Sequence, residues 1–260
     1  MDADAWSAAL EDWRAARLAA LKADDGWLNL TDRIEITPGR HSVGTGPEND
    51  LRISAGPAHL GTLILTRAGV ASFRLPGGEE EDFGPRPDAP PRLVVDSVLL
   101  EIHRVEGHPA LRVRDLRSRA RESFAGLRHF PPDPAWVIRA DWIELDKPAM
   151  ADVALVDGRS EKVQLTHSAS FLHEGQRVTL IPTHWKGGKP MFVIRDATSG
   201  KDTYGAARFL IGEDIGGGKI TLDFNKAHNP PCAFTDLAVC PLPPPQNILP
   251  FPVRAGELKP

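Results

Sequence analysis

The segment RFLIGEDIGGGKITLDFN, residues 208–225, alternates apolar and polar side chains on both sides of a glycine-rich stretch. This pattern is typical of an antiparallel β-hairpin, with GEDIGGG at 212–218 as a flexible turn. Because side chains alternate between the faces of a strand, matching the apolar faces places Arg208 opposite Asp223. Asn225 lies on the same polar face, two residues beyond Asp223. The hairpin therefore predicts a charged pair with a polar neighbour on one face of a sheet.

The predicted charged pair has two interpretations. Arg208 could clamp an anionic ligand while Asp223 orients its guanidinium group. The same two residues could equally form an ion pair that stabilises a partly buried strand. Tyr204, the single tyrosine of the chain, and Asn229 lie close in the sequence and offer further hydrogen-bonding groups. The candidate ligand-binding residues are therefore Tyr204, Arg208, Asp223, Asn225 and Asn229.

Three further residues that could bind a metal or take part in catalysis follow the hairpin, namely His228, Cys232 and Cys240. They could bind a transition metal, although their spacing lacks the CxxC pattern of structural zinc sites. Cys232 could also be a nucleophile with His228 as its base. We favour two structural thiols, or a disulfide in the presence of an oxidant, and assign no metal ligand. Asp196, at the head of DATSG, is expected to form a turn rather than to act as a general base.

No motif identifies a reaction. The chain has no GxSxG, no P-loop and no GxGxxG after a strand, so a local catalytic triad or nucleotide site is not indicated. The sequence therefore predicts neither a reaction class nor a cofactor, and it leaves open whether the chain is an enzyme.

The composition is that of an ordinary globular protein, with 41% hydrophobic and 25% charged residues and a formal net charge of −4. Such a balance gives no positive field that would attract nucleic acid or anionic lipid. MDADAW at the start lacks the layout of a signal peptide, and no apolar run approaches the roughly 20 residues that span a bilayer. We expect a cytoplasmic protein that binds neither nucleic acid nor a membrane.

Four regions are expected along the chain. Residues 1–30 hold an amphipathic helix and its anchor. Arg17 is expected to pack its stem while its charged head reaches water, and the alternative is that it reaches into a pocket on the body of the protein. Residues 31–117 form a β region, residues 118–135 a linker, and residues 136–260 a second β region that carries the motifs. The predicted fold is mainly β, with the N-terminal helix on a small β-sandwich, followed by a C-terminal curved sheet or barrel.

Two segments of the first β region carry specific expectations. GGEEEDFGPRPDAPP, residues 77–91, is acidic and rich in glycine and proline, so it is expected to be an exposed loop. VGTGPENDLRIS, residues 43–54, resembles forkhead-associated domains, although Thr45 stands where their phosphate-binding arginine would be. His59 could match their downstream histidine. The alternative is a turn in which Asn49-Asp50 satisfies backbone groups.

Four motifs lie in the last third of the chain: DATSGKDTYGAARFL, LDFNKAHNPPCAF, CPLPPPQN and AGE. With GWLNL and VGTGPENDLRI upstream, they resemble a bacterial and archaeal family known as domain of unknown function 1684, over nearly the whole chain. His228 departs from the pattern, since such motifs usually carry tyrosine there. The resemblance implies no established activity. It does imply that the family motif concentrates on a set of polar residues: Tyr204, Arg208, Asp223, Asn225, Asn229, Cys232, Cys240, Asn247 and Glu257.

These observations leave three hypotheses of function. The first is a pocket for a small polar or anionic ligand, with or without catalysis. The second is a structural or protein-interaction module whose motif residues form a buried hydrogen-bond network, with Asn229, Asn247 and Glu257 bonded to backbone. The third is a metal-binding protein that uses the histidine and cysteines.

Overall fold

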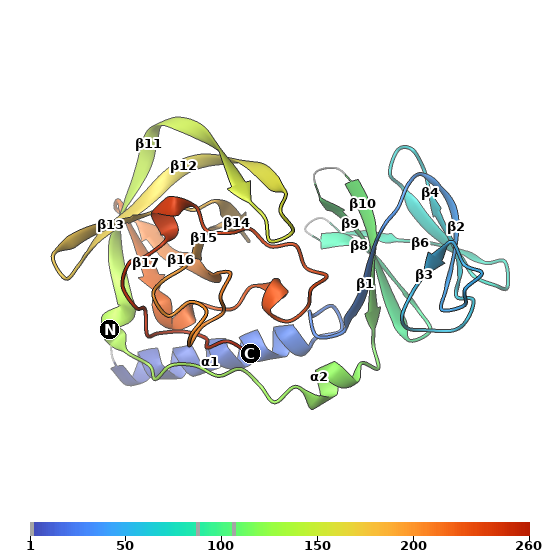
Figure 1. Ribbon diagram of the computed structural model, residues 1–260, viewed down its shortest axis with the longest axis horizontal. Coiled ribbons are helices and arrows are strands. Elements are labelled where there is room, and N and C mark those ends of the chain that lie inside the picture. Colours follow the sequence, from blue (N-terminus) through green and yellow to red (C-terminus); the bar gives the residue numbers. More distant parts are fainter. Residues whose placement is uncertain (1–2, 87–88, 106–107) are drawn as a thin grey trace. The chain divides into compact units, whose positions relative to one another are not determined.

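The fold is mainly β, as predicted, and a computed structural model describes residues 3–86, 89–105 and 108–260 of it. By its internal contacts the chain divides into two compact units (Figure 1). We call Ala19–Phe124 the sandwich unit, and Met1–Leu18 with Ala125–Pro260 the motif unit. Among the helices of the described ranges, none is long and apolar enough to cross a membrane.

The sandwich unit contains two five-stranded sheets, with strand orders β1-β10-β9-β8-β7 and β3-β2-β4-β5-β6. Neighbouring strands are antiparallel except for the pair β2 and β3. The elements are β1 (Leu30–Glu35), β2 (Gly39–Gly44), β3 (Leu51–Arg52), β4 (Gly61–Leu65), β5 (Ala71–Arg74), β6 (Glu80–Asp82), β7 (Gly84–Arg86), β8 (Ala89–Val95), β9 (Val98–Val105), β10 (His108–Asp115) and the short helix α2 (Arg119–Ser123).

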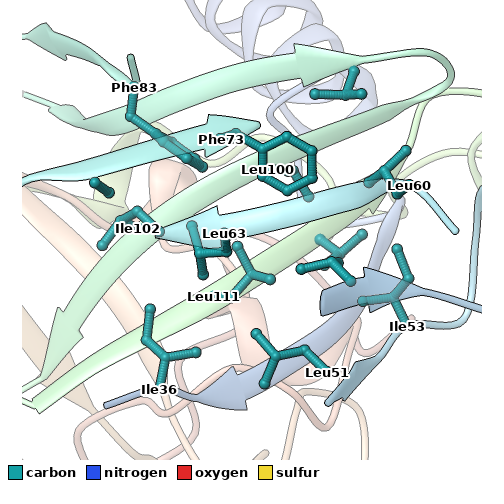
Figure 2. Close-up of a cluster of buried hydrophobic side chains, with 14 of the residues drawn as sticks. Ile36, Leu51, Ile53, Leu60, Leu63, Phe73, Phe83, Leu100, Ile102 and Leu111 are labelled. Atoms are coloured by element: carbon teal, nitrogen blue, oxygen red, sulfur yellow. The ribbon is translucent and has the colours of Figure 1, made fainter. Parts of the chain in front are cut away.

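The two sheets share one hydrophobic core. Figure 2 shows Leu63 and Phe73 of one sheet in the same cluster as Leu100 and Leu111 of the other. All four side chains are fully buried. Buried residues alternate with less buried ones along β4 and β5, as expected for strands with one face on a core. This arrangement matches the predicted small β-sandwich.

The segment expected to be an exposed loop, residues 77–91, contains strands β6 and β7 and the start of β8. This part of the prediction is wrong within the described residues, and residues 87–88 lie outside them. The physical reason is that an edge strand needs only backbone pairing. Charged side chains are compatible with a sheet edge, and the exposed β6 pairs with β5 through Ser72 and Asp82.

The segment that resembles forkhead-associated domains is held by its own side chains. Nδ2 of Asn49 donates to the carbonyl groups of Gly46, at 2.9 Å, and Ala58, at 2.7 Å. The ring of His59 lies 3.1 Å from Oδ1 of Asn49. These contacts favour the turn-forming interpretation of Asn49. The likeness to forkhead-associated domains stays a prediction.

The motif unit is built on one open seven-stranded antiparallel sheet with the order β13-β12-β11-β17-β16-β15-β14. The predicted alternative of a barrel is corrected, because no sheet of the described chain closes on itself. The strands are β11 (Val137–Ala154), β12 (Ser160–His173), β13 (Gln176–Leu180), β14 (His184–Lys186), β15 (Lys189–Ile194), β16 (Arg208–Gly216) and β17 (Lys219–Asp223).

Helix α1 (Ala3–Lys22) belongs to the motif unit as far as Leu18. Nε1 of Trp6 donates to Oδ2 of Asp223 at 3.4 Å, and the Trp13 ring lies 5.9 Å from the His228 ring. Up to Leu18 the helix therefore contacts the motif unit, and its residues 19–22 belong to the sandwich unit. Its apolar stripe was predicted from spacing, but a stripe does not say which sheet covers it.

The hairpin β16–β17 has a different register from the predicted one. Gly212 lies opposite Leu222, whereas apolar matching placed Phe209 there. Strand β16 extends to Gly216, so the turn is only Gly217-Gly218, and both of these residues have positive φ angles of 57° and 69°. A two-residue turn of this kind fits the twist of a hairpin, and a register shift between Glu213 and Gly216 completes the observed pairing. The three-residue shift moves Arg208 away from Asp223.

Candidate functional site

Several of the polar motif residues are bonded to residues 241–260, the C-terminal strap, or lie in it. The strap is rich in proline, which lacks a backbone N–H and cannot pair fully in a sheet. It makes isolated backbone contacts instead: Leu249 donates to the carbonyl of Arg195 at 2.8 Å, and Glu257 donates to that of Ala227 at 2.8 Å. Side-chain hydrogen bonds add to these backbone bonds in holding the strap in place.

Arg208 is the centre of one group of contacts to the strap. Its side chain is 1% exposed, and its Nη2 donates to Oδ2 of Asp196 at 2.8 Å. The same nitrogen donates to the carbonyl of Val253 at 3.1 Å, and Nη1 donates to that of Ala255. Burial lowers the pKa of Arg208, while Asp196 opposes this shift. The predicted pairing of Arg208 with Asp223 is wrong, because the hairpin register separates them.

Asp196 combines the predicted turn with the role of counterion. Its Oδ1 accepts hydrogen bonds from the backbone N–H of Thr198 at 2.8 Å and from the Thr198 hydroxyl at 2.6 Å. The backbone N–H of Val253 donates to the same oxygen at 3.2 Å. The turn-forming role is confirmed. The carboxylate is also the second half of a buried ion pair, which the sequence reasoning missed.

Asp223 and Asn225 form a separate group at the end of β17. Oδ1 of Asp223 accepts from the backbone N–H of Asn225 at 3.0 Å and from its Nδ2 at 2.9 Å. Asn225 in turn accepts from the backbone N–H of Asp133 and donates to its carbonyl, both at 2.9 Å. With Trp6 on the other oxygen of Asp223, these residues connect helix α1, β17 and the segment before β11.

Glu257 and Asn229 are joined by Arg17 of helix α1. Glu257 is fully buried, and its Oε1 accepts from Nε of Arg17 at 3.1 Å while its Oε2 accepts from the Asn229 backbone at 2.8 Å. Nη2 of Arg17 donates to the Asn229 carbonyl at 2.9 Å, and Nδ2 of Asn229 donates to the Leu258 carbonyl at 2.7 Å. Burial raises the pKa of Glu257, although Arg17 acts in the opposite direction. The expectation that the head of Arg17 reaches water is corrected.

Asn247 fixes the first turn of the strap. Its side chain is fully buried, and its Oδ1 accepts from the backbone N–H of Ile181 at 2.8 Å. Its Nδ2 donates to the carbonyls of Ile181 and Val193, both at 2.9 Å. The side-chain amide thus forms hydrogen bonds with backbone groups just after β13 and within β15, as the backbone of a neighbouring strand would.

Tyr204 and the two cysteines meet near the strap. The half-buried Tyr204 donates from its hydroxyl to the Cys232 carbonyl at 2.9 Å, and burial raises its pKa. Cys232 and Cys240 are both thiols, and the Cys240 sulfur accepts from the Cys232 backbone at 3.3 Å. A hydrogen bond with Cys240 lowers the pKa of Cys232.

His228 does not join the cysteines in a metal site. Within the described residues, no group of three or more His, Cys, Asp or Glu side chains could hold a metal ion. Its Nδ1 lies 3.1 Å from the carbonyl of Lys226. Burial first, then Arg17, lowers the pKa of His228 to about 3, so the ring is neutral near pH 7. The metal-binding hypothesis is therefore set aside.

The five predicted residues thus contact different parts of the protein. Arg208 contacts Asp196, Asp223 contacts Asn225, and Asn229 contacts Glu257. Among them only Tyr204 is partly exposed, and the other four are buried. Sequence reasoning missed Asp196 and Arg17 as partners. Asp196 opens one of the recognised motifs, and Arg17 lies on the apolar stripe of its helix, so both positions carried a signal.

Comparisons with known proteins give a family but no activity. The family model described as "Protein of unknown function (DUF1684)" matches residues 122–258. Among solved structures, the chain is similar to the solution NMR structure of an uncharacterized protein from Haloarcula marismortui. The two share 33% sequence identity over 54% of this chain and 79% of that one, with a TM-score of 0.44. No curated protein matches the chain.

Proposed function

The chain belongs to the DUF1684 family of proteins of unknown function, and we propose that the polar residues of its C-terminal motifs form a structural frame that fixes the C-terminal strap. On this proposal the chain is a structural or protein-interaction module. The observation that carries the proposal is the environment of Asn247, whose fully buried amide makes three hydrogen bonds to backbone groups of the sheet region.

The energetics of burial support this proposal. A buried polar group is costly unless it is hydrogen-bonded, and the cost is recovered only when its partners are fixed. Arg208, Asn229 and Glu257 are also buried, and each is bonded to the strap or belongs to it. The frame therefore contributes to stability only while the strap is in place, which couples the strap to the sheet and to helix α1.

Adjacent residues of the strap offer a matched test. We expect Asn247→Ala to lower the free energy of unfolding by about 2 kcal/mol, because three backbone groups lose a partner. Gln246→Ala, at an exposed neighbouring position, is the control and should change stability by less than about 0.5 kcal/mol. Hydrogen exchange measured by mass spectrometry should show faster exchange across residues 241–260 in the first variant only. Unchanged protection there would contradict the proposal.

A small polar or anionic ligand is the second candidate for these motifs. Its support is the half-buried position of Tyr204 and the Oδ1 atom of Asn229, which has no hydrogen-bond partner among the described residues. Mass spectrometry of the purified chain after denaturation tests this candidate. A stoichiometric small molecule that is lost in Tyr204→Phe, while the melting temperature is retained, would favour ligand binding over the frame.

A further inference from the structure

The outer face of the β1–β10–β9–β8 sheet carries a row of charged residues across all four strands. The strand register sets Arg33 beside Arg112, Arg112 beside Glu101, and Glu101 beside Arg92. Since side chains alternate along a strand, the residues between them face the opposite side. Those residues belong to the core of the sandwich: Leu100, Ile102, Leu111 and Val113.

Glu101 serves three arginines at once. Nε of Arg92 lies 2.9 Å from its Oε2, Nη1 of Arg112 lies 3.1 Å from its Oε1, and Nη1 of Arg114 lies 3.3 Å from its Oε2. Arg92 has a second carboxylate, Asp25, at 2.6 Å. Two carboxylates thus face three guanidinium groups, and this cluster retains an excess of positive charge.

The interior of the cluster has hydrogen-bond donors to spare. Glu101, Arg112 and Arg114 are 1%, 8% and 2% exposed. Nε of Arg112 is buried and has no hydrogen-bond partner in the part of the chain that the structure describes, and the buried Nη1 of Arg114 has an ion pair with Glu101 at 3.3 Å but no hydrogen bond there. Burying a guanidinium group whose N–H groups are not all bonded is unfavourable. An additional acceptor at this place would therefore be stabilised.

Neighbouring groups respond to the positive field. Burial alone would raise the pKa of Glu101, but Arg114 and Arg112 together hold it below its usual value. Burial and then Arg112 lower the pKa of His103 to about 4. The Trp27 ring lies against the cluster, with its centroid 5.1 Å from the guanidinium carbon of Arg112.

A cavity of about 360 Å³ opens on the same unit, next to this cluster. It is lined by Asp24, Asp25, Arg92, Leu93, Val94 and Leu99. Leu99 is the cross-strand neighbour of Arg114, and Arg92 belongs to the cluster itself, so the cavity lies beside the cluster, although Arg112 and Arg114 do not line it. The two aspartates at the cavity are ion-paired, Asp24 with Arg121 and Asp25 with Arg92.

We propose that this cavity and the adjoining arginines bind a small oxyanion of the phosphate class. The anion would accept hydrogen bonds from Arg92, which lines the cavity, while Arg112 and Arg114, which do not line it, would contribute positive charge nearby. Planar guanidinium groups bind phosphate oxygens with good geometry, and a second anion beside Glu101 would balance the excess charge. The apolar floor of Val94 and Leu99 leaves room for an organic group, so the ligand is either inorganic phosphate or a phosphomonoester.

The test is a titration of the full chain with inorganic phosphate and, separately, with glycerol phosphate at constant ionic strength. We expect a saturable rise in melting temperature and line broadening in the phosphorus NMR spectrum, both weakened by added sodium chloride. Binding of both compounds would indicate an inorganic phosphate site, and binding of glycerol phosphate alone would indicate a phosphomonoester site. If neither compound binds in a saturable way, the proposal is overturned.

Variants keep this test independent of folding. Arg92→Ala removes a proposed ligand contact but also breaks two ion pairs. Val94 is 54% exposed and lines the cavity, so Val94→Asp adds a negative charge there without disturbing the core. We expect it to weaken phosphate binding by about tenfold or more. Val70→Asp, at a valine that is 62% exposed and does not line this cavity, is the control. Equal phosphate binding by the wild type, Val94→Asp and Val70→Asp would overturn the proposal.

Discussion

Nε of Arg17 lies 3.1 Å from Oε1 of Glu257, and this ion pair joins helix α1 to the C-terminal strap within the motif unit. The Arg17 side chain is 16% exposed and that of Glu257 is fully buried. The second oxygen of Glu257 is bonded to the Asn229 backbone. A carboxylate in this position depends on its cation, because water does not reach it. The end of the chain is thus fixed by a residue of its first helix.

Removing the guanidinium group of Arg17 should lower the stability of the chain. We expect Arg17→Met to lower the free energy of unfolding by about 3 kcal/mol, since it leaves the Glu257 carboxylate buried and unpaired. Urea unfolding of the purified chain measures the change. Lys162→Met is the control, because Lys162 and Asp152 form a pair on the surface with side chains 73% and 64% exposed. That change should cost less than about 0.5 kcal/mol, and a similar small loss for Arg17→Met would show that the buried pair contributes little.

Two double-mutant cycles can separate the observed partner of Arg208 from the predicted one. Arg208→Met and Asp196→Asn should be coupled by about 2 kcal/mol, because the two side chains share a buried ion pair. Arg208→Met and Asp223→Asn should be nearly additive, within about 0.5 kcal/mol, since Asp223 is bonded to Asn225 and Trp6. Urea unfolding of all the variants gives both values. A larger coupling with Asp223 would contradict the observed register.

The comparison of sequence and structure separates local from non-local information. Alternating apolar and polar residues predicted the two strands of the hairpin at 208–225, because burial on one face of a sheet imposes a period of two. The register of β16 and β17 was predicted wrongly, because apolar matching allowed several pairings. The deciding features were the two-residue turn at Gly217-Gly218 and the register shift between Glu213 and Gly216.

The partners of the polar residues were harder to predict. The motifs identified which residues belong to the buried network, but Arg208 could have paired with any nearby carboxylate. The choice of Asp196 depends on the path of the strap, which brings Val253 and Ala255 to the same guanidinium group. Contacts of this kind span tens to hundreds of residues, and no local pattern encodes them.

The turn itself yields a prediction. Gly217→Val should destabilise the chain by about 1–2 kcal/mol, because a β-branched residue strongly disfavours a positive φ angle. Gly217→Asn should be tolerated within about 0.5 kcal/mol, because asparagine adopts this conformation in turns of the same type. A Cβ atom at Gly217 would meet no other group within 4 Å, so steric contact does not confuse the result. Equal urea midpoints for the two variants would argue against the two-residue turn.

His228 should make the chain sensitive to acid. Burial holds its pKa at about 3 in the folded state, against about 6.5 for an exposed histidine. Below about pH 6.5, His228 therefore binds a proton in the unfolded chain but not in the folded chain. Stability is complete above this pH and is lost as the pH falls towards 3, at about 1.4 kcal/mol per pH unit from this group.

The variant His228→Phe should flatten the pH dependence of stability between pH 6 and pH 4 by about one proton. The phenyl ring keeps the contacts with Trp13 and Phe209, and the substitution removes the imidazole whose protonation differs between the two states. Urea unfolding at several pH values gives the slope. His108→Phe, at an exposed position, is the control and should leave the slope unchanged. Some acid sensitivity should persist in His228→Phe, since burial also lowers the pKa values of His103 and His129 to about 4. If His228→Phe and the wild type show the same slope, His228 is protonated in the folded chain and its buried, neutral state is ruled out.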